Sequence, residues 1–125
     1  MKYSYSEEFL PPALVMPAEF GIPHQDDVSF KCRAKLDTGA DVSVVPRKFI
    51  ERFRPLAFNT LCIRQTGRRE HSYLLEIMIA GHRYSVEAVA HDASYALIGR
   101  DVLNQAVLIA DGPREIFELH HPRGN

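Results

Sequence analysis

Apolar and polar residues alternate along residues 28–36. One face carries Val28, Phe30, Cys32, Ala34 and Leu36, and the other carries Ser29, Lys31, Arg33 and Lys35. Because successive side chains of a strand point to opposite faces, this period of two predicts a half-buried β-strand. Glycine and small polar residues at positions 37–41 then interrupt the alternation, and an apolar run follows at positions 42–45. The pattern therefore predicts a strand, a tight loop and another strand.

A brief helix is expected next. Pro46 suits the first helical turn because its φ is fixed, and Pro55 prevents the helix from continuing much beyond Phe53. Residues 61–90 then alternate around two turn-like segments, which indicates hairpins; the turns are Gln65-Thr66-Gly67-Arg68 and Ala80-Gly81-His82.

The last part of the chain repeats this punctuated pattern. It predicts a short apolar strand at residues 95–98, one helical turn at residues 101–105, and strands at residues 107–109 and 116–119 on either side of Asp111-Gly112-Pro113. Many short strands with little helix indicate an all-β barrel or sandwich.

Length and composition limit the architecture. A chain of 125 residues is near the common size of one domain, so a single compact core is expected. Pro11 and Pro12 make the beginning of the chain extended. We therefore predict an extended N-terminal arm at residues 1–22 and one domain at residues 23–125.

Charge and hydropathy exclude several classes of partner. Hydrophobic residues make up 46% of the chain and charged residues 25%, with a net charge of -1, which argues against disorder and against a nucleic-acid partner. No run approaches the roughly 20 apolar residues that span a bilayer. A soluble, cytoplasmic protein with no membrane partner is predicted.

The cysteines and histidines indicate no cofactor. Cys32 and Cys62 are too widely separated for a zinc knuckle or a redox pair, so small buried thiols are expected. The six histidines lack metal-ligand spacing with cysteine or acidic partners. No metal site and no cofactor are predicted.

Candidate chemistry lies where the strand at residues 28–36 ends. Asp37 follows the strand directly, and Thr38 and Gly39 come next. Gly39 allows the backbone to turn sharply, which places a carboxylate at the mouth of a loop. Asp37 could also be an ordinary turn-capping aspartate. Because the tripeptide is short, its flanking residues must decide between these interpretations.

The flanks favour catalysis. Residues 36–46, with the sequence LDTGADVSVVP, strongly resemble the active-site loop of retropepsin-like aspartic proteases. Residues 96–104, with the sequence ALIGRDVLN, resemble the second signature of that family, an apolar pair before glycine followed by a short helix. Residues 73–89 are similar to the hairpin between flap and core, and residues 108–113 to the closing segment of bacterial single-lobe members. The resemblance covers most of the chain after about residue 28.

The resemblance implies an aspartic endopeptidase that acts on a peptide or protein substrate. Its fold would be a single-lobe, closed barrel or sandwich with one or two short helices. Pepsin-like enzymes carry two Asp-Thr-Gly loops in a chain more than twice as long, whereas this chain carries one. A C2 homodimer is therefore implied, with Asp37 of each subunit on the axis.

The resemblance also assigns roles to the neighbouring residues. Asp37 would be catalytic, Thr38 would brace the opposite loop, and the Gly39 carbonyl would bind the substrate main chain. Substrate binding or structural support is implied for Ala40, Asp41, Gly99 and Arg100. We expect Asp41 and Arg100 to form a partly buried, bidentate ion pair.

The flap is where this sequence departs from the family. Members of the family cover the substrate with a glycine-rich hairpin, but residues 64–70 contain only Gly67. The same stretch holds Arg64, Arg68 and Arg69, which either form a solvated loop or favour acidic substrate side chains.

Two alternatives to an active protease remain. One is a catalytically weak or inactive retropepsin-like module that dimerises and binds peptides. The other is that the N-terminal arm through Pro17 silences the enzyme as a propeptide or lid. Asp101 and Asp111 have simpler explanations, as a helix N-cap and a turn residue.

Overall fold

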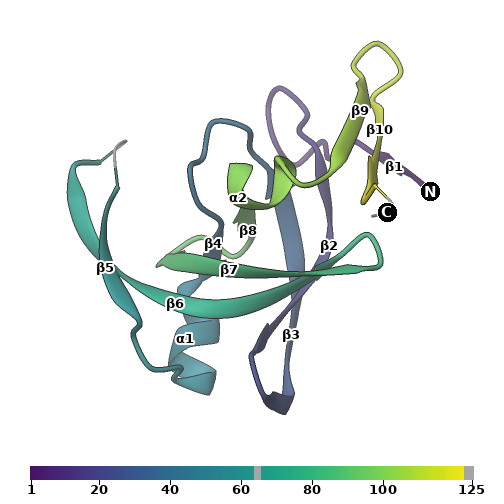
Figure 1. The fold of residues 1–125 in the computed structure, drawn as a ribbon. Coiled ribbons are helices and arrows are strands. Elements are labelled where there is room, and N and C mark those ends of the chain that lie inside the picture. Colours follow the sequence, from purple (N-terminus) through teal and green to yellow (C-terminus); the bar gives the residue numbers. More distant parts are fainter. Residues whose placement is uncertain (64–65, 123–125) are drawn as a thin grey trace.

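The computed structural model describes residues 1–63 and 66–122, which form ten strands and two short helices (Figure 1). The strands are β1 (Lys2–Ser4), β2 (Val15–Ile22), β3 (Gln25–Leu36), β4 (Val44–Pro46), β5 (Asn59–Ile63), β6 (Arg68–Ile79), β7 (His82–His91), β8 (Ala96–Ile98), β9 (Val107–Asp111) and β10 (Ile116–His120). The helices are α1 (Arg47–Phe53) and α2 (Arg100–Leu103). This confirms the predicted all-β class with one or two short helices.

Seven strands form one sheet that closes on itself. Their order is β2-β3-β8-β4-β7-β6-β5, and β2 also pairs with β6. The extra pairing, from Glu19 opposite Met78 to Gly21 opposite Glu76, joins the two sides of the sheet into a barrel. Strand β5 pairs only with the first part of β6, so these two strands extend from the barrel as a hairpin (Figure 1).

A second, smaller sheet joins the two ends of the described chain. Its order is β1-β10-β9, all antiparallel, with Lys2 opposite Glu118 and Phe117 opposite Ala110. Tyr3 stacks on Phe117, with ring centroids 5.4 Å apart, and Phe117 is buried in the main core. The small sheet is therefore packed onto the barrel through this aromatic side chain.

The first 22 residues are integrated into both sheets. Strand β1 belongs to the small sheet and β2 to the barrel, and Met16, Ala18 and Phe20 are buried. The sequence analysis did not predict β2, because Pro17 and Gly21 are residue types that strands disfavour. Pro17 is tolerated because β6 pairs with β2 only over residues 19–21, which leaves one side of β2 free at Pro17. Removing these residues would leave β3 paired only with β8, at residues 34–36, and would leave one side of β6 unpaired at residues 76–78.

The predicted periodicities match the burial of the side chains. Along β3, Ala34 and Leu36 are buried while Lys31 and Arg33 are exposed, and along β6, Leu75, Ile77 and Ile79 are buried. Helix α1 begins directly after Pro46 and ends at Phe53, as predicted, with Arg54 in the left-handed conformation (φ 49°). Helix α2 begins at residue 100 and not at residue 101.

Helix α1 closes one end of the barrel through Phe49. The side chain of Phe49 is fully buried and contacts three other rings, those of Phe20, Phe30 and Phe53, at centroid distances of 6.2, 5.5 and 5.3 Å. These rings come from β2, β3 and α1, so one side chain holds three elements together. Aromatic contacts of this kind add to the free energy gained from burial.

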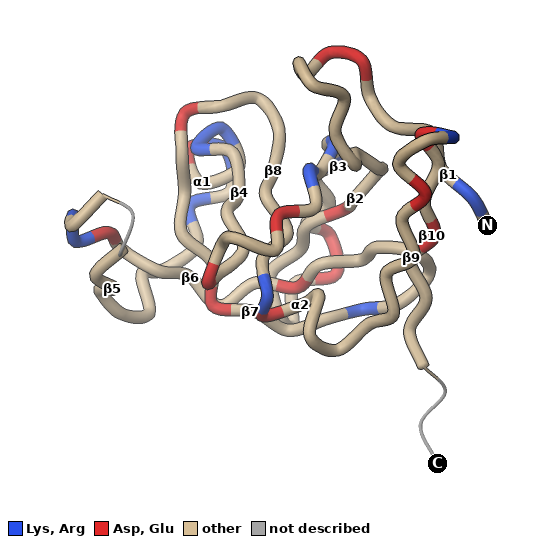
Figure 2. The backbone as a smooth tube through the Cα atoms, turned by 90° about the horizontal axis from the view of Figure 1, so that it is seen from above, with Lys and Arg blue, Asp and Glu red and all other residues tan. Residues whose placement is uncertain are grey.

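The surface shows no concentration of one charge. Figure 2 shows basic and acidic residues interspersed over most elements. Five arginines form ion pairs with carboxylates: Arg33 with Glu8, Arg47 with Asp92, Arg83 with Glu76, Arg100 with Asp41 and Arg114 with Asp111. Within residues 1–63 and 66–122, neither helix has the length and apolarity needed to cross a bilayer.

Replacing Phe49 with alanine should lower the free energy of unfolding by about 3–5 kcal/mol, because the cavity would be lined by three rings that cannot collapse together. Urea denaturation followed by circular dichroism measures this change. The control is Phe58→Ala, since Phe58 is 57% exposed and its loss should cost no more than about 0.5 kcal/mol. Equal losses for the two variants would contradict this account of the core.

Candidate active site

The Asp37 loop begins where β3 and β8 run parallel. Residues 34–36 pair with residues 96–98, and the backbone N–H of Asp37 donates to the Ile98 carbonyl over 2.9 Å. The Gly39 N–H donates to Asp37 Oδ1 over 2.9 Å, and the Ala40 N–H donates to the Asp37 carbonyl over 3.1 Å. Asp37 therefore does cap its own turn, and this bond fixes the direction of the carboxylate.

Gly99 lies directly against the Asp37 loop. A Cβ at position 99 would meet the backbone C and O of Val42 at 2.8 Å and the carbonyl O of Ala40 at 2.9 Å. Real Cβ atoms do not approach backbone this closely, so only glycine fits here. The contact interlocks the two segments that the sequence analysis singled out, residues 37–41 and residues 96–104.

Arg100 holds the loop from the opposite direction. Its backbone N–H donates to the Ala40 carbonyl over 2.9 Å, one guanidinium nitrogen donates to the Thr38 carbonyl over 2.7 Å, and the other pairs with Asp41. The predicted ion pair is present and partly buried, but it is not bidentate. Arg100 divides its two nitrogens between Asp41 and Thr38, and the two side chains are 42% and 39% exposed.

A buried network of hydrogen bonds also connects the segment after the Asp37 loop to the segment around Gly99. The Ser43 hydroxyl donates to Asp101 Oδ1 over 2.8 Å and accepts the Gly99 N–H over 3.1 Å, while the Ser43 N–H donates to Asp101 Oδ2 over 2.9 Å. Ser43 is fully buried, so each of these groups needs its partner; an unsatisfied one costs about 1–3 kcal/mol. The network joins the residue before β4, the residue after β8 and helix α2.

The sequence analysis missed these two residues. Asp101 was expected to be a helix N-cap, but that position belongs to Gly99, and the Asp101 carboxylate is held by Ser43. The available signal was a serine inside the apolar run 42–45, since a buried hydroxyl requires a partner. The expectation for Asp111 is confirmed, because its carboxylate accepts the Arg114 N–H in the β9–β10 turn.

A cavity of about 390 Å³ opens beside Asp37. Its size is within the range of small-molecule and side-chain binding sites. Apolar side chains from β4, β5, β7 and β8 form most of its wall; the lining residues are Asp37, Ala40, Asp41, Val42, Val44, Leu61, Cys62, Ile63, Val89 and Leu97. The β5–β6 hairpin stands opposite the Asp37 loop across this cavity, so a carboxylate, an apolar pocket and a covering hairpin come together.

The two cysteines have different environments. Cys32 is partly buried, and this burial raises the pKa of its thiol to about 11. Cys62 is exposed on the hairpin and lines the Asp37 cavity, so the expectation of two buried thiols is wrong for Cys62. Its position follows from the register of the hairpin, in which Cys62 lies opposite Arg69.

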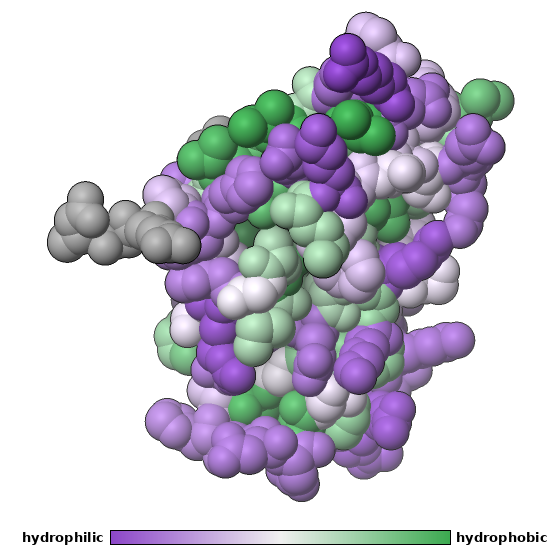
Figure 3. Space-filling view, turned by 90° about the vertical axis from the view of Figure 1, so that its right-hand side faces the viewer, coloured by the Kyte–Doolittle hydropathy of each residue, from purple (hydrophilic) through white to green (hydrophobic). Residues whose placement is uncertain are grey.

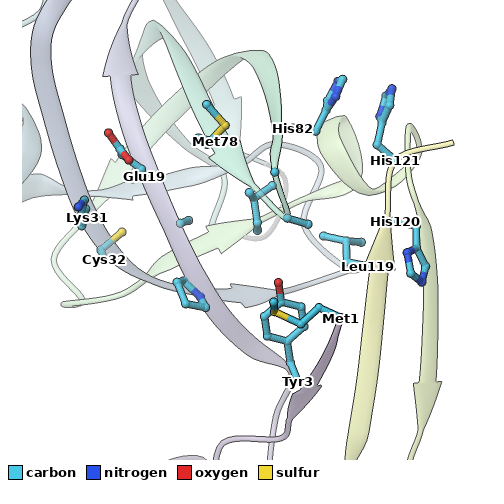
Figure 4. Close-up of a pocket in the computed structure, with 15 residues that line it drawn as sticks. Met1, Tyr3, Glu19, Lys31, Cys32, Met78, His82, Leu119, His120 and His121 are labelled. Carbon is cyan, nitrogen blue, oxygen red and sulfur yellow. The ribbon is translucent and has the colours of Figure 1, made fainter. Parts of the chain in front are cut away.

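A larger cavity of about 890 Å³ shares no lining residue with the first. It lies where β1 and β10 meet the barrel, on the face that Figure 3 shows with apolar residues framed by hydrophilic ones. Figure 4 shows Met1 and Tyr3 on one wall and His82 beside His121 on another. These two imidazoles stack with centroids 3.4 Å apart, and Tyr84 hydrogen-bonds His121 over 3.2 Å. The carboxylate that lines this cavity, that of Glu19, accepts a hydrogen bond from the Ser29 hydroxyl. Neither of the two segments that the sequence analysis singled out lines this cavity, so Asp37 marks the better candidate site.

The expected site residues thus lie together in one place. Asp37, Thr38, Gly39, Ala40 and Asp41 form the loop, and Gly99 and Arg100 support it. Arg64 of the expected flap lies outside the described residues. Among the described residues, no group of three or more histidine, cysteine or acidic side chains is placed to hold a metal ion.

The sequence of this chain matches one family of known proteins. The family described as spumavirus aspartic protease (A9) matches residues 28–106, which is more than half of the chain. No curated protein sequence matches the chain.

Solved structures share the fold. The retropepsin-like aspartic protease from Rickettsia conorii aligns with a TM-score of 0.67 at 13% identity, over 97% of this chain and 90% of that one. The EIAV protease in complex with the inhibitor HBY-793 aligns with a TM-score of 0.58 at 21% identity, over 82% and 92% of the two chains. A foamy viral protease-reverse transcriptase bound to an RNA/DNA hybrid aligns with a TM-score of 0.58 at 17% identity over 74% of this chain, which spans 12% of that protein.

Replacing Gly99 with alanine should lower the free energy of unfolding by about 1–3 kcal/mol, because the new methyl group would press on the backbone of residues 40 and 42. The midpoint of urea denaturation measures the loss. Gly112→Ala is the matched control, since a Cβ at position 112 has no atom within 4 Å. A Gly99→Ala protein as stable as Gly112→Ala would mean that the two segments are not interlocked.

Proposed function

Since this chain belongs to the retropepsin-like aspartic proteases, we propose that it is an aspartic endopeptidase that works as a homodimer, with one Asp37 from each subunit. The observation that carries the proposal is the position of Asp37. Its carboxylate is fixed by Gly39 at the edge of an apolar cavity and lies opposite a hairpin that can cover a peptide.

A dimer is needed because peptide hydrolysis by this chemistry uses two carboxylates. One must be ionised to take a proton from water, and the other must be protonated to polarise the substrate carbonyl. The chain contains one Asp-Thr-Gly sequence, so the second carboxylate has to come from another copy. A two-fold axis between the Asp37 loops supplies it.

The small sheet offers a surface on which two copies can meet. Strand β9 is at the edge of the sheet, with one side unpaired, and it exposes the apolar side chains of Val107 and Ile109 (45% and 52%). Exposed apolar edge strands tend to pair with another chain. Pairing of β9 with β9 of a second copy would extend the sheet across the two-fold axis and bury these side chains.

The reaction then follows from the geometry of the paired loops. The ionised Asp37 removes a proton from a water molecule, whose oxygen attacks the carbonyl carbon while the protonated Asp37 donates to the carbonyl oxygen. The tetrahedral intermediate collapses when the C–N bond breaks. The leaving nitrogen takes a proton from the protonated carboxyl of the dyad, and one hydroxyl of the intermediate returns a proton to the ionised carboxylate, so the dyad again holds one proton. In the proposed dimer, two carboxylates about 3 Å apart cannot both be negatively charged without strong repulsion, so the pair would hold one proton between them.

The supporting residues have matching roles in this proposal. The Gly39 carbonyl would accept a hydrogen bond from the substrate main chain, and Thr38, which is exposed, would brace the loop of the partner. Val42, Val44 and Leu97 would receive an apolar side chain next to the scissile bond. The substrate class is therefore an extended peptide with an apolar residue at the cleavage site.

Asp37→Asn should abolish hydrolysis, with a loss of roughly 10²–10⁴-fold or more, because the amide cannot take a proton from water. A mixture of peptides is incubated with each protein between about pH 4 and 7, the range in which a shared-proton dyad works, and new termini are read by mass spectrometry. The control is Asp27→Asn, an exposed aspartate on β3. Equal cleavage by wild type and Asp37→Asn would exclude the dyad, and no cleavage by dimeric wild type would favour the inactive, peptide-binding alternative.

Ile109→Lys should weaken the dimer at least about tenfold and lower activity at dilute protein concentration, because it would bring a charged side chain from each copy into the proposed interface. Sedimentation equilibrium gives the dissociation constant. Leu74→Lys is the control, since Leu74 is 45% exposed on β6 and not on the small sheet. An unchanged dimer for Ile109→Lys would place the interface elsewhere.

A further inference from the structure

The β5–β6 hairpin has an inner face and an outer face, and the register assigns each residue to one of them. Leu61 pairs with Glu70 and Ile63 pairs with Arg68, whereas Cys62 pairs with Arg69. Directly opposite residues in an antiparallel pair point to the same face. Arg68 therefore shares a face with Leu61 and Ile63, and Arg69 points to the other side with Cys62.

Burial identifies the face that points toward the Asp37 loop. Leu61 and Ile63 are partly buried and line the Asp37 cavity, and Ser72, further along the same face, is completely buried. Thr60 and Cys62, on the alternate positions of β5, are exposed, although Cys62 is also among the residues that line the cavity. The face that carries Arg68 is therefore the inner one, and Arg68 lies at the end of this face nearest the hairpin turn.

The guanidinium of Arg68 has no carboxylate partner among the described residues. Its exposed side chain contrasts with the five arginines that form ion pairs elsewhere. The nearest acidic residue on the same face, Glu70, lies two positions along the strand. Figure 2 shows the basic residues at the outer end of this hairpin.

We infer that Arg68 makes this site selective for peptides with an acidic residue close to the apolar residue at the cleavage site. The inference rests on the proposed function, because it concerns the same cleft. A peptide that fills the apolar cavity lies under the inner face of the hairpin, so a neighbouring glutamate or aspartate can reach the guanidinium in a charge-assisted hydrogen bond. In the proposed dimer the second hairpin supplies a second Arg68, so the preference extends to both sides of the scissile bond.

The expected size of the preference is modest because Arg68 is exposed. An exposed ion pair discriminates by about 1.5- to 5-fold in kcat/KM between glutamate and glutamine at the preferred position. The preference should fade as the pH falls through about 4.3, where the substrate glutamate becomes neutral.

The experiment compares wild type, Arg68→Gln and Arg69→Gln on pairs of peptides that differ only in glutamate or glutamine on either side of an apolar cleavage site. Arg69→Gln is the matched control, since it removes the same charge from the outer face of the same hairpin. We expect the glutamate-to-glutamine ratio of kcat/KM to fall to about one in Arg68→Gln and to persist in Arg69→Gln. Equal ratios in all three proteins, or an equal loss in both variants, would overturn the role of Arg68.

Binding separates this inference from the proposed catalysis. The same peptides are titrated into Asp37→Asn protein, with and without Arg68→Gln, and the dissociation constants are compared. A glutamate preference that depends on Arg68, in a protein whose wild type cuts none of the peptides, would support the inference and contradict the proposed protease. Cleavage by wild type without a glutamate preference would do the reverse.

Discussion

The close contact between Gly99 and the Ala40–Val42 backbone is the constraint on which the rest of the site depends. Two segments about sixty residues apart in sequence can approach this closely only where one of them has no side chain. Once they are in contact, the Asp37 N–H reaches the Ile98 carbonyl and the Arg100 N–H reaches the Ala40 carbonyl. The direction of the Asp37 carboxylate is therefore determined by packing of backbone on backbone, which is stiffer than side-chain packing.

The two groups of polar residues around this contact contribute unequally to stability. The Ser43–Asp101 network lies inside the protein, where each hydrogen bond is costly to lose. The Asp41–Arg100 pair lies at the surface, where ion pairs contribute little to stability. The surface pair nevertheless holds the Thr38 carbonyl through the same guanidinium, so its main effect is on the shape of the loop.

Much of the fold could be predicted from the sequence, because the periodicity and the turn residues of these segments agree with the structure that they adopt. Alternation along residues 28–36, the helix after Pro46 and the hairpins between residues 59 and 91 follow from periodicity and turn chemistry. Strand β2 could not be predicted in the same way, since Pro17 and Gly21 conceal an alternation that only pairing with β3 and β6 makes favourable. The partner of Asp101 was also hidden, because a hydrogen bond between residues so distant in sequence depends on the folded register. The motifs located the loop correctly but not the geometry of its ion pair, because Arg100 divides its two terminal nitrogens between Asp41 and the Thr38 carbonyl.

The pairing of β1 with β10 has a consequence for how the protein is made. Almost the whole chain separates these strands, yet they are neighbours in one sheet. Phe117 of β10 lies opposite Tyr3 of β1, and its side chain is part of the main core. During synthesis the β2–β3 hairpin can form early, but the barrel closes only after β6 has emerged, and β1 waits for the last strand. Contacts this distant in sequence form slowly and leave apolar strands exposed in the meantime. The nascent chain therefore has no complete small sheet, and no complete edge for a second copy, until translation has passed residue 120.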